Sequence, residues 1–273
     1  EIMYHPPEPS PEELAAGFGD QDEFEFIELL NISTSTVDLG GASFSEGLSF
    51  EFAPPSSTSL PPGGRVVIAR NSDAFTLRYG EPASLVGEFA GGTGLANGGE
   101  RLRLADLGGG TINDFTYDDR QPWTEAADGG GYSLVLIDPA SAPDHRLAGN
   151  WRLSSRPGGN PGGGDAIAFV GDPLADDDGD GMSNLMNHAL GGSGSSFAPS
   201  IEQGATGLIY SHRRNLAADD VRVTLEVSGD LLTWAPISTA ASEAPLGDGT
   251  SRLSWRLPPG TPRDFVRLRA ELR

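Results

Sequence analysis

Apolar and polar residues alternate with a period of two in short runs throughout residues 1–171. The clearest of these runs are F-I-E-L-L (26–30), R-V-V-I-A (65–69), R-L-R-L (101–104) and Y-S-L-V-L-I (132–137). Because a strand turns successive side chains to opposite faces, this period predicts strands with one face in a core. Glycine- and proline-rich turns separate the runs, and only Pro11 to Gly17, preceded by Ser10 as N-cap, looks helical. We therefore expect an all-β sandwich or barrel here.

A second set of alternating runs begins near residue 200. Its members are G-L-I-Y-S-H (207–212), V-R-V-T-L-E-V (221–227), R-L-S-W-R-L (252–257) and F-V-R-L-R-A-E-L (265–272). Turn residues separate them, as in the first region. The pattern predicts a small C-terminal β-sandwich of fibronectin type III character over residues 193–273. The predicted fold class is thus all-β, with two immunoglobulin-like sandwich domains.

The order of several weak motifs in the first domain resembles the lamin-tail domain, an immunoglobulin-like sandwich that also occurs in secreted bacterial proteins. The motifs are F-I-E-L-L-N (26–31), V-D-L-G-G-A-S-F (37–44), L-P-P-G-G-R-V-V-I-A (60–69), L-A-N-G-G-E-R-L-R-L (95–104), Y-D-D-R-Q-P-W (117–123), D-G-G-G-Y-S-L-V-L (128–136) and N-W-R-L-S (150–154). The resemblance covers roughly residues 1–165. It implies a binding or spacer module without chemistry of its own. It also implies core positions for two tryptophans and turn positions with positive φ for four glycines: Trp123, Trp151, Gly98, Gly99, Gly129 and Gly131.

The net charge of the chain argues against some classes of binding partner. The 273-residue chain has a formal net charge of −21, no cysteine and no lysine, so its 18 basic residues are all arginine. A strongly acidic chain repels phosphate backbones and anionic lipid, which argues against nucleic acid and membrane surfaces as partners. No apolar run approaches the roughly 18 residues needed to span a bilayer, so we expect no membrane insertion. The absence of cysteine excludes disulfides and thiolate metal sites.

No catalytic constellation can be assembled from the sequence. The four histidines, His5, His145, His188 and His212, are scattered without a metalloprotease-type spacing, and surface or strand-end positions are the expected alternative to a catalytic role. Pairs of carboxylates such as Asp118 and Asp119 are what chance supplies in so acidic a chain. We therefore expect a protein that is not an enzyme.

Residues 172–180 contain five aspartates and no arginine, and a motif that binds calcium in other proteins begins among them. Counting from Asp176, D-D-D-G-D-G-M-S-N-L-M-N places oxygen ligands and a glycine at the positions of an EF-hand-type loop, and it resembles the dockerin loop and the thrombospondin type 3 repeats. The predicted ligands are Asp176, Asp178, Asp180, the carbonyl of Met182, Asn184 and Asn187. Gly181 would make the sharp turn at position 6. The alternative is a disordered acidic linker.

A short helix, Ser183 to Leu190, is expected after this loop, and Gly191 and Gly192 should end it. Position 12 carries a neutral Asn187 where a bidentate Glu is usual, so we expect a dissociation constant near ~10⁻⁴ M, in the range of extracellular modules. Asp172 or a carboxylate of either domain could complete the shell. The predicted organisation is therefore a sandwich at 1–171, a calcium loop and helix at 172–192, and a sandwich at 193–273.

These features predict a non-enzymatic structural or adhesion module, extracellular or at the cell surface, whose inter-domain joint calcium makes rigid. Two alternatives are a subunit of an extracellular filament or surface layer, and an accessory C-terminal region of a larger secreted enzyme. The expected partners are proteins, by self-association or through neighbouring surface-protein domains. Six arginines near the C-terminus are expected in one region: Arg252, Arg256, Arg263, Arg267, Arg269 and Arg273. The preferred interpretation is that they are ordinary outward-facing strand residues, and the alternative is a basic face that docks an acidic one, within the chain or on a neighbour.

Overall fold

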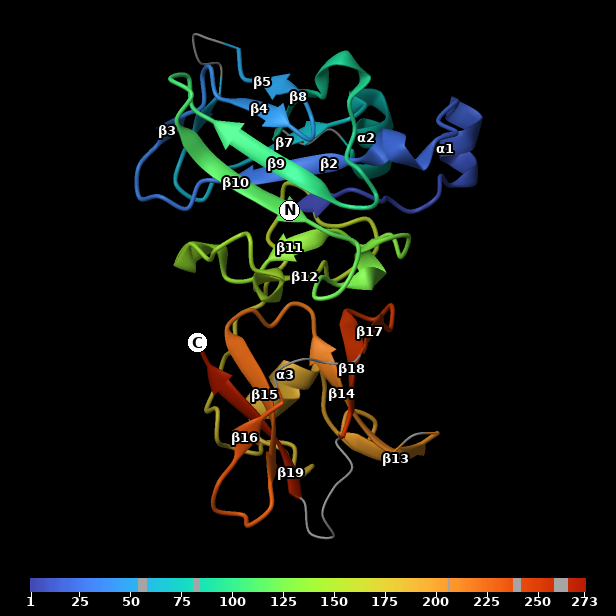
Figure 1. Ribbon diagram of the computed structural model, residues 1–273, viewed down its shortest axis with the longest axis vertical. Coiled ribbons are helices and arrows are strands. Elements are labelled where there is room, and N and C mark those ends of the chain that lie inside the picture. Colours follow the sequence, from blue (N-terminus) through green and yellow to red (C-terminus); the bar gives the residue numbers. More distant parts are fainter. Residues whose placement is uncertain (54–57, 81–83, 206, 238–241, 258–264) are drawn as a thin grey trace. The chain divides into compact units, whose positions relative to one another are not determined.

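A computed structural model describes residues 1–53, 58–80, 84–205, 207–237, 242–257 and 265–273 (Figure 1). The chain divides into two compact units, Glu1–Asp165 and Ala166–Arg273, and each is described by itself. The division lies six residues before the predicted boundary at 171. The predicted calcium loop and its helix consequently belong to the second unit and are not a separate connecting segment.

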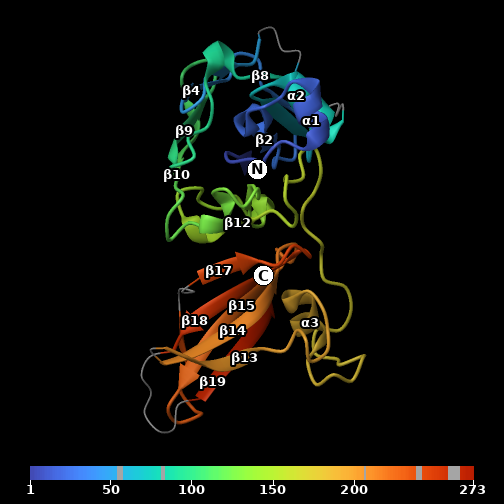
Figure 2. The same cartoon turned by 90° about the vertical axis from the view of Figure 1, so that its right-hand side faces the viewer.

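The first unit is built from two main sheets, which Figure 2 shows as separate layers. The larger sheet has the order β12 (Trp151–Leu153), β11 (Leu134–Leu136), β1 (Ile2–Met3), β2 (Phe26–Leu30), β7 (Arg65–Ala69) and β8 (Leu85–Glu88). The smaller sheet has the order β10 (Thr111–Tyr117), β9 (Glu100–Ala105), β4 (Ser43–Glu46) and β5 (Phe50–Glu51), and β3 (Val37–Asp38) pairs with β6 (Ser59–Leu60). The predicted all-β class is confirmed.

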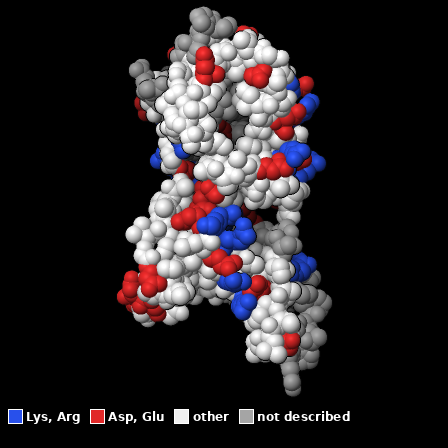
Figure 3. Space-filling view, turned by 90° about the vertical axis from the view of Figure 1, so that its left-hand side faces the viewer, with Lys and Arg blue, Asp and Glu red and all other residues white. Residues whose placement is uncertain are grey.

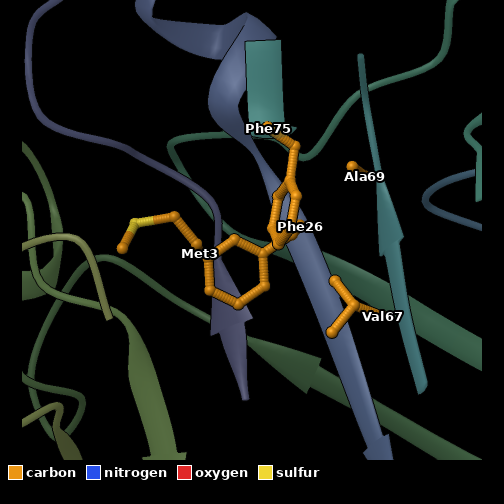
Figure 4. Packing of buried hydrophobic residues seen from close by; sticks show 5 residues of the cluster. All are labelled: Met3, Phe26, Val67, Ala69 and Phe75. Carbon is orange, nitrogen blue, oxygen red and sulfur yellow. The ribbon is translucent and has the colours of Figure 1, made fainter. Parts of the chain in front are cut away.

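Apolar residues from the larger sheet and one helix form the core cluster shown in Figure 4. Met3, Phe26, Val67, Ala69 and Phe75 are all fully buried. The rings of Phe26 and Phe75 meet edge to face with centroids 5.7 Å apart, a favourable aromatic geometry. Burial along these two strands does not alternate: three consecutive residues of β2 and four of β7 are buried, so both faces of the strands are covered there, which corrects the expectation of one buried face.

The positions that the family resemblance implied for two tryptophans and four glycines are largely those observed. Trp123 and Trp151 are 8% and 7% exposed, so both are core residues. Positive φ occurs at three of the four glycines, Gly99, Gly129 and Gly131, whereas Gly98 is not among the positive-φ residues, which corrects that expectation. Gly99 also lies where a Cβ would come within 2.5 Å of the Tyr117 carbonyl oxygen, so only glycine fits there.

One predicted helix is present in the first unit and one helix was missed. Helix α1 (Pro11–Ala16) begins after Ser10, whose hydroxyl and the Glu13 carboxylate form a capping box. Helix α2 (Ser72–Tyr79) is a correction to the expectation that only α1 is helical. It joins β7 to β8, which run parallel, and a parallel pair requires such a crossover. Short 3-10 turns lie at Gln21–Phe24, Ala90–Gly92, Glu125–Ala127, Pro139–Ser141 and Ala148–Asn150.

The contact between α1 and α2 gives a testable dependence of stability on pH. Glu13 is 6% exposed, and Arg78 Nε donates to it over 2.7 Å. This hydrogen bond lowers the pKa of Glu13 to about 2. A depressed carboxyl pKa adds stability above the unfolded value near 4.3, and this is lost as the pH falls towards 2. Its size is on the order of 2 kcal/mol.

We expect Glu13→Gln to remove most of this pH dependence, so that its free energy of unfolding changes less than that of the wild type between pH 6 and pH 2.5. Urea titrations at the two pH values measure the difference. Glu12→Gln is the matched control, since Glu12 is an exposed neighbour on the same helix. Equal acid sensitivity of Glu13→Gln and the wild type would contradict the prediction.

The second unit is a sandwich of two sheets and a helix. One sheet has the order β13 (Ser200–Gly204), β14 (Gly207–Asn215), β18 (Thr250–Arg256) and β17 (Ser242–Pro245), and the other has the order β16 (Ala235–Pro236), β15 (Val221–Ser228) and β19 (Phe265–Leu272). Tyr210 and Trp255 of the first sheet meet Leu225 of the second in a buried cluster. Helix α3 (Asn184–Leu190) lies against the strands β14, β15 and β19 (Figure 2).

Among the described residues, no helix combines the length and apolar character required to cross a membrane.

Candidate metal centre

Three aspartates of the predicted calcium loop converge in the structure. Asp176, Asp178 and Asp180 each place one carboxylate oxygen within 4.8 Å of the other two, and all three residues are exposed. Three carboxylates this close repel one another at neutral pH unless a cation lies among them. Hard oxygen ligands of this kind suit calcium.

Backbone hydrogen bonds hold the loop in this shape. The Asp176 carboxylate accepts from the N–H groups of Asp180 and Gly181, over 3.1 and 3.0 Å. Gly179 and Gly181 have φ values of +71° and +88°, in the left-handed region that favours glycine. Gly181 stands at position 6, where an EF-hand loop requires a sharp turn. The glycine that the motif requires is therefore the residue at which the chain turns.

Asp180 connects the loop to the segment after the helix. Its carboxylate accepts from the N–H of Gly194 and, over 2.8 Å, from the N–H of Met182. The Gly194 bond, followed by the Met182 bond, lowers the pKa of Asp180. Asp180 is therefore ionised at neutral pH, as a metal ligand must be. No sequence motif indicated Gly194, because its role depends on the fold bringing it back to the loop.

Asn187, at position 12 of the motif, has an unsatisfied oxygen. Its Oδ1 is buried and has no hydrogen-bond partner among the described residues, while its Nδ2 lies 3.5 Å from Asp178 Oδ2. A buried acceptor without a partner is costly, so such an atom indicates a missing partner. Helix α3 presents Asn187 one turn after its start, beside the aspartate cluster. Since Nδ2 is the Asn187 atom that faces Asp178, Oδ1 would reach a cation among the aspartates only if the amide group turned over and the two atoms exchanged places.

The other predicted ligands are placed differently. The Asn184 side chain faces Asp177 and Asp172: its Nδ2 donates to Asp177 Oδ2 over 2.8 Å and to the Asp172 carbonyl over 3.2 Å, and its Oδ1 accepts from the Asp177 N–H. The Asn184 side chain therefore stabilises the loop by hydrogen bonds and is not part of the aspartate cluster. The backbone N–H of Met182 donates to the Asp180 carboxylate, whereas its predicted ligand atom was the carbonyl oxygen. Asp172, suggested as a completing ligand, caps the N–H of Leu174.

Helix α3 attaches the loop to the core of the second unit. Ser183 caps its N-terminus and Gly191 ends it with a φ of +87°. Leu185, Ala189 and Val221 form a buried cluster between the helix and the sheet. The predicted helix is therefore present, and its apolar face explains its position: the residues that follow the loop are part of the sandwich.

The four histidines form no catalytic pair with a serine hydroxyl among the described residues. His5 contacts Asp128 over 2.5 Å, and His188 contacts Asp220 over 3.1 Å. His212 is 4% exposed and stacks on Trp255, which corrects the expectation of a surface or strand-end histidine. Burial lowers the pKa of His212 to about 4, so it is a neutral core residue at pH 7.

The predicted single basic region does not form. Strand β18 carries Arg252 and Arg256 in one sheet, whereas β19 carries Arg267 and Arg269 in the other. Arg267 binds Glu226 over 2.6 Å and Arg269 pairs with Glu271. Figure 3 views the side on which β15 and β19 lie, and basic and acidic side chains are adjacent there. Arg263 lies outside the described residues.

Together these observations define an all-β protein of two units, the first an immunoglobulin-like sandwich and the second a sandwich that carries an acidic loop. Residues 1–119 match the family model of the Lamin Tail Domain. This match covers less than half of the chain and lies within the first unit, where it marks a stretch that is similar to lamin tail domains. No curated protein and no solved structure was found to match the chain.

Proposed function

We propose that the chain is a non-enzymatic structural module of the cell exterior or cell surface, and that its second unit binds one calcium ion. The observation that carries the proposal is the convergence of the Asp176, Asp178 and Asp180 carboxylates, whose oxygens lie within 4.8 Å of one another in a loop with EF-hand spacing. The oxygen donors fit calcium: Asp176, Asp178, Asp180 and Asn187 are all hard ligands. The similarity of the first unit to lamin tail domains supports a structural role.

The expected affinity for calcium supports the proposed extracellular location. The site would have four ligand side chains, each supplying one oxygen, and no bidentate Glu. We therefore expect weak binding, with a dissociation constant on the order of 10⁻⁴ M. Such a site fills only where calcium is near millimolar, which is outside the cell. The partners that suit a structural module are proteins, including further copies of itself.

The position of the site changes the role that calcium would have. The loop and α3 belong to the second unit, so the ion would fix residues 172–194 to that unit's sandwich and would not act between two domains. The buried residues Leu185, Ala189 and Leu190 make this an attachment of helix to core. Calcium binding and stability of the second unit are therefore expected to be linked.

Calorimetric titration of chelator-treated protein with calcium tests the proposal. We expect one site in the wild type and no measurable binding in Asp180→Ala, since Asp180 is both a ligand and the contact to Gly194. Asp177→Ala is the matched control: it removes the same charge from the same loop, but Asp177 is bound to Asn184 outside the cluster. Asn187→Glu should bind more tightly because it supplies a bidentate ligand. Absence of binding in the wild type would refute the calcium site.

A further inference from the structure

The outer face of the sheet β13-β14-β18-β17 has an unusual composition. Side chains alternate along a strand, and Tyr210 and Trp255 point into the core, so the residues beside them lie on the outer face. The register places four serines in one row across all four strands, and we call this row with two flanking arginines the serine–arginine face: Ser200, Ser211, Ser254, Ser242, Arg252 and Arg256. The serine side chains in the middle of this face are small and polar.

The two arginines of the serine–arginine face have no acidic partner among the residues that the structure describes. Arg252 and Arg256 are exposed, and neither makes an ion pair or hydrogen bond with any residue that the structure describes. Arg252 lies directly opposite Arg213, and like charges at such positions destabilise a sheet. Arg213 is matched by Asp248 and stacks over Phe197, so the positive charge that remains belongs to Arg252. Glu202 lies on the same face, in the row of Ile209 and Arg256, so the face as a whole carries a small net positive charge in a chain of net charge −21.

The first unit is the strongly acidic part of the chain. The first unit carries 25 acidic residues against nine arginines. Carboxylates bind guanidinium groups with two parallel hydrogen bonds, and serine hydroxyls add donors beside them. Only charges within about a Debye length, near 10 Å at 0.1 M salt, take part in such a contact, so the net repulsion between two copies does not decide it.

We propose that the serine–arginine face binds the acidic first unit of a second copy of this chain. The contact joins different surfaces on the two copies, so it is heterologous, and its repetition gives a ring if the rotation closes or an open chain of molecules if it does not. It rests on the proposed structural role of the module but uses no metal ligand. Arg252 and Arg256 supply the charge, and the serine row supplies the small, polar surface on which carboxylates approach them.

Sedimentation equilibrium of the full chain tests this proposal. We expect concentration-dependent association of the wild type at 50 mM salt that weakens strongly at 500 mM salt. Arg252→Glu/Arg256→Glu should weaken association at least tenfold. The control is Arg222→Glu/Arg269→Glu, which changes the net charge equally on the other sheet of the same unit and should have a much smaller effect. Circular dichroism verifies folding, and each experiment is run with and without calcium, so that loss of the metal site is seen separately.

Mixing experiments distinguish this contact from others. The variant Arg252→Glu/Arg256→Glu keeps its acidic first unit, so it should still bind a wild-type molecule, end the growing assembly and lower its mean mass. Three results would overturn the proposal: a variant that associates like the wild type, a wild type that stays monomeric to ~1 mM, or binding of dextran sulfate to the face without self-association. The last would identify a polyanion as the occupant.

Discussion

Chelation of calcium should make residues 172–191 cleavable by protease while the first unit stays resistant. Without a cation, the carboxylates of Asp176, Asp178 and Asp180 repel one another within 4.8 Å, and Asn187 Oδ1 keeps no partner. With calcium a hundredfold above the dissociation constant, binding adds about 2.7 kcal/mol to the stability of the bound form. That free energy favours the closed loop and the attachment of α3 to the sandwich.

Limited proteolysis and thermal unfolding, each with and without calcium, measure this effect. Calcium should raise the unfolding temperature of the second unit and suppress cleavage in the loop. Asp180→Ala should show the chelated pattern under both conditions, whereas Asp177→Ala should keep the calcium response. If the wild-type loop resists protease equally in both conditions, the loop is held by its own hydrogen bonds and calcium has no part in its order.

The second large effect is expected from the buried ion pair of the first unit. Arg152 and Asp165 have side chains that are 1% and 4% exposed, and Arg152 Nη1 donates to Asp165 Oδ2 over 2.6 Å. Arg152→Met leaves the Asp165 carboxylate buried with only its bonds to Ser155. Breaking one side of a buried pair typically lowers stability by about 3–5 kcal/mol. We expect a loss of this size in the free energy of unfolding.

Two further variants give this prediction its controls. Arg146→Met removes an exposed arginine that pairs with Asp144, and should change stability by less than about 1 kcal/mol. The double variant Arg152→Met/Asp165→Leu removes both charges and should recover much of the loss, because no unpaired charge remains. Urea denaturation followed by tryptophan fluorescence measures all three. If Arg152→Met is as stable as the wild type, the Arg152–Asp165 ion pair makes no net contribution to the free energy of unfolding.

The elements that sequence predicted well depend on local signals. Helix α1 follows from Ser10, Pro11 and Glu13, which together specify a capping box. Helix α2 had a comparable signal, with Asn71 as N-cap and Gly80 after the last turn, but its pattern is only weakly amphipathic and it lies between strand-like runs. Its existence is fixed by the parallel pairing of β7 and β8, a non-local requirement.

In the candidate metal site, too, the features that depend on local sequence were predictable and those that depend on the fold were not. The spacing in the sequence specified which aspartates converge and where the chain turns, because both depend on residues within one loop. It did not specify that Asn184 turns to Asp177, or that Gly194 returns to bind Asp180. Similarly, consecutive arginine-rich runs suggested one basic region. The strands β18 and β19 join different sheets, and only the pairing of strands reveals this.

A short chain of contacts leads from the calcium loop to the serine–arginine face. Asp180 binds the N–H of Gly194, and three residues later the ring of Phe197 covers the guanidinium of Arg213, which lies opposite Arg252. Two ligands that act on one such segment obey thermodynamic reciprocity. Whatever factor calcium contributes to the affinity between copies, assembly must contribute the same factor to the affinity for calcium. If calcium strengthens the contact between copies, molecules within an assembly would retain the ion at concentrations that leave isolated molecules empty.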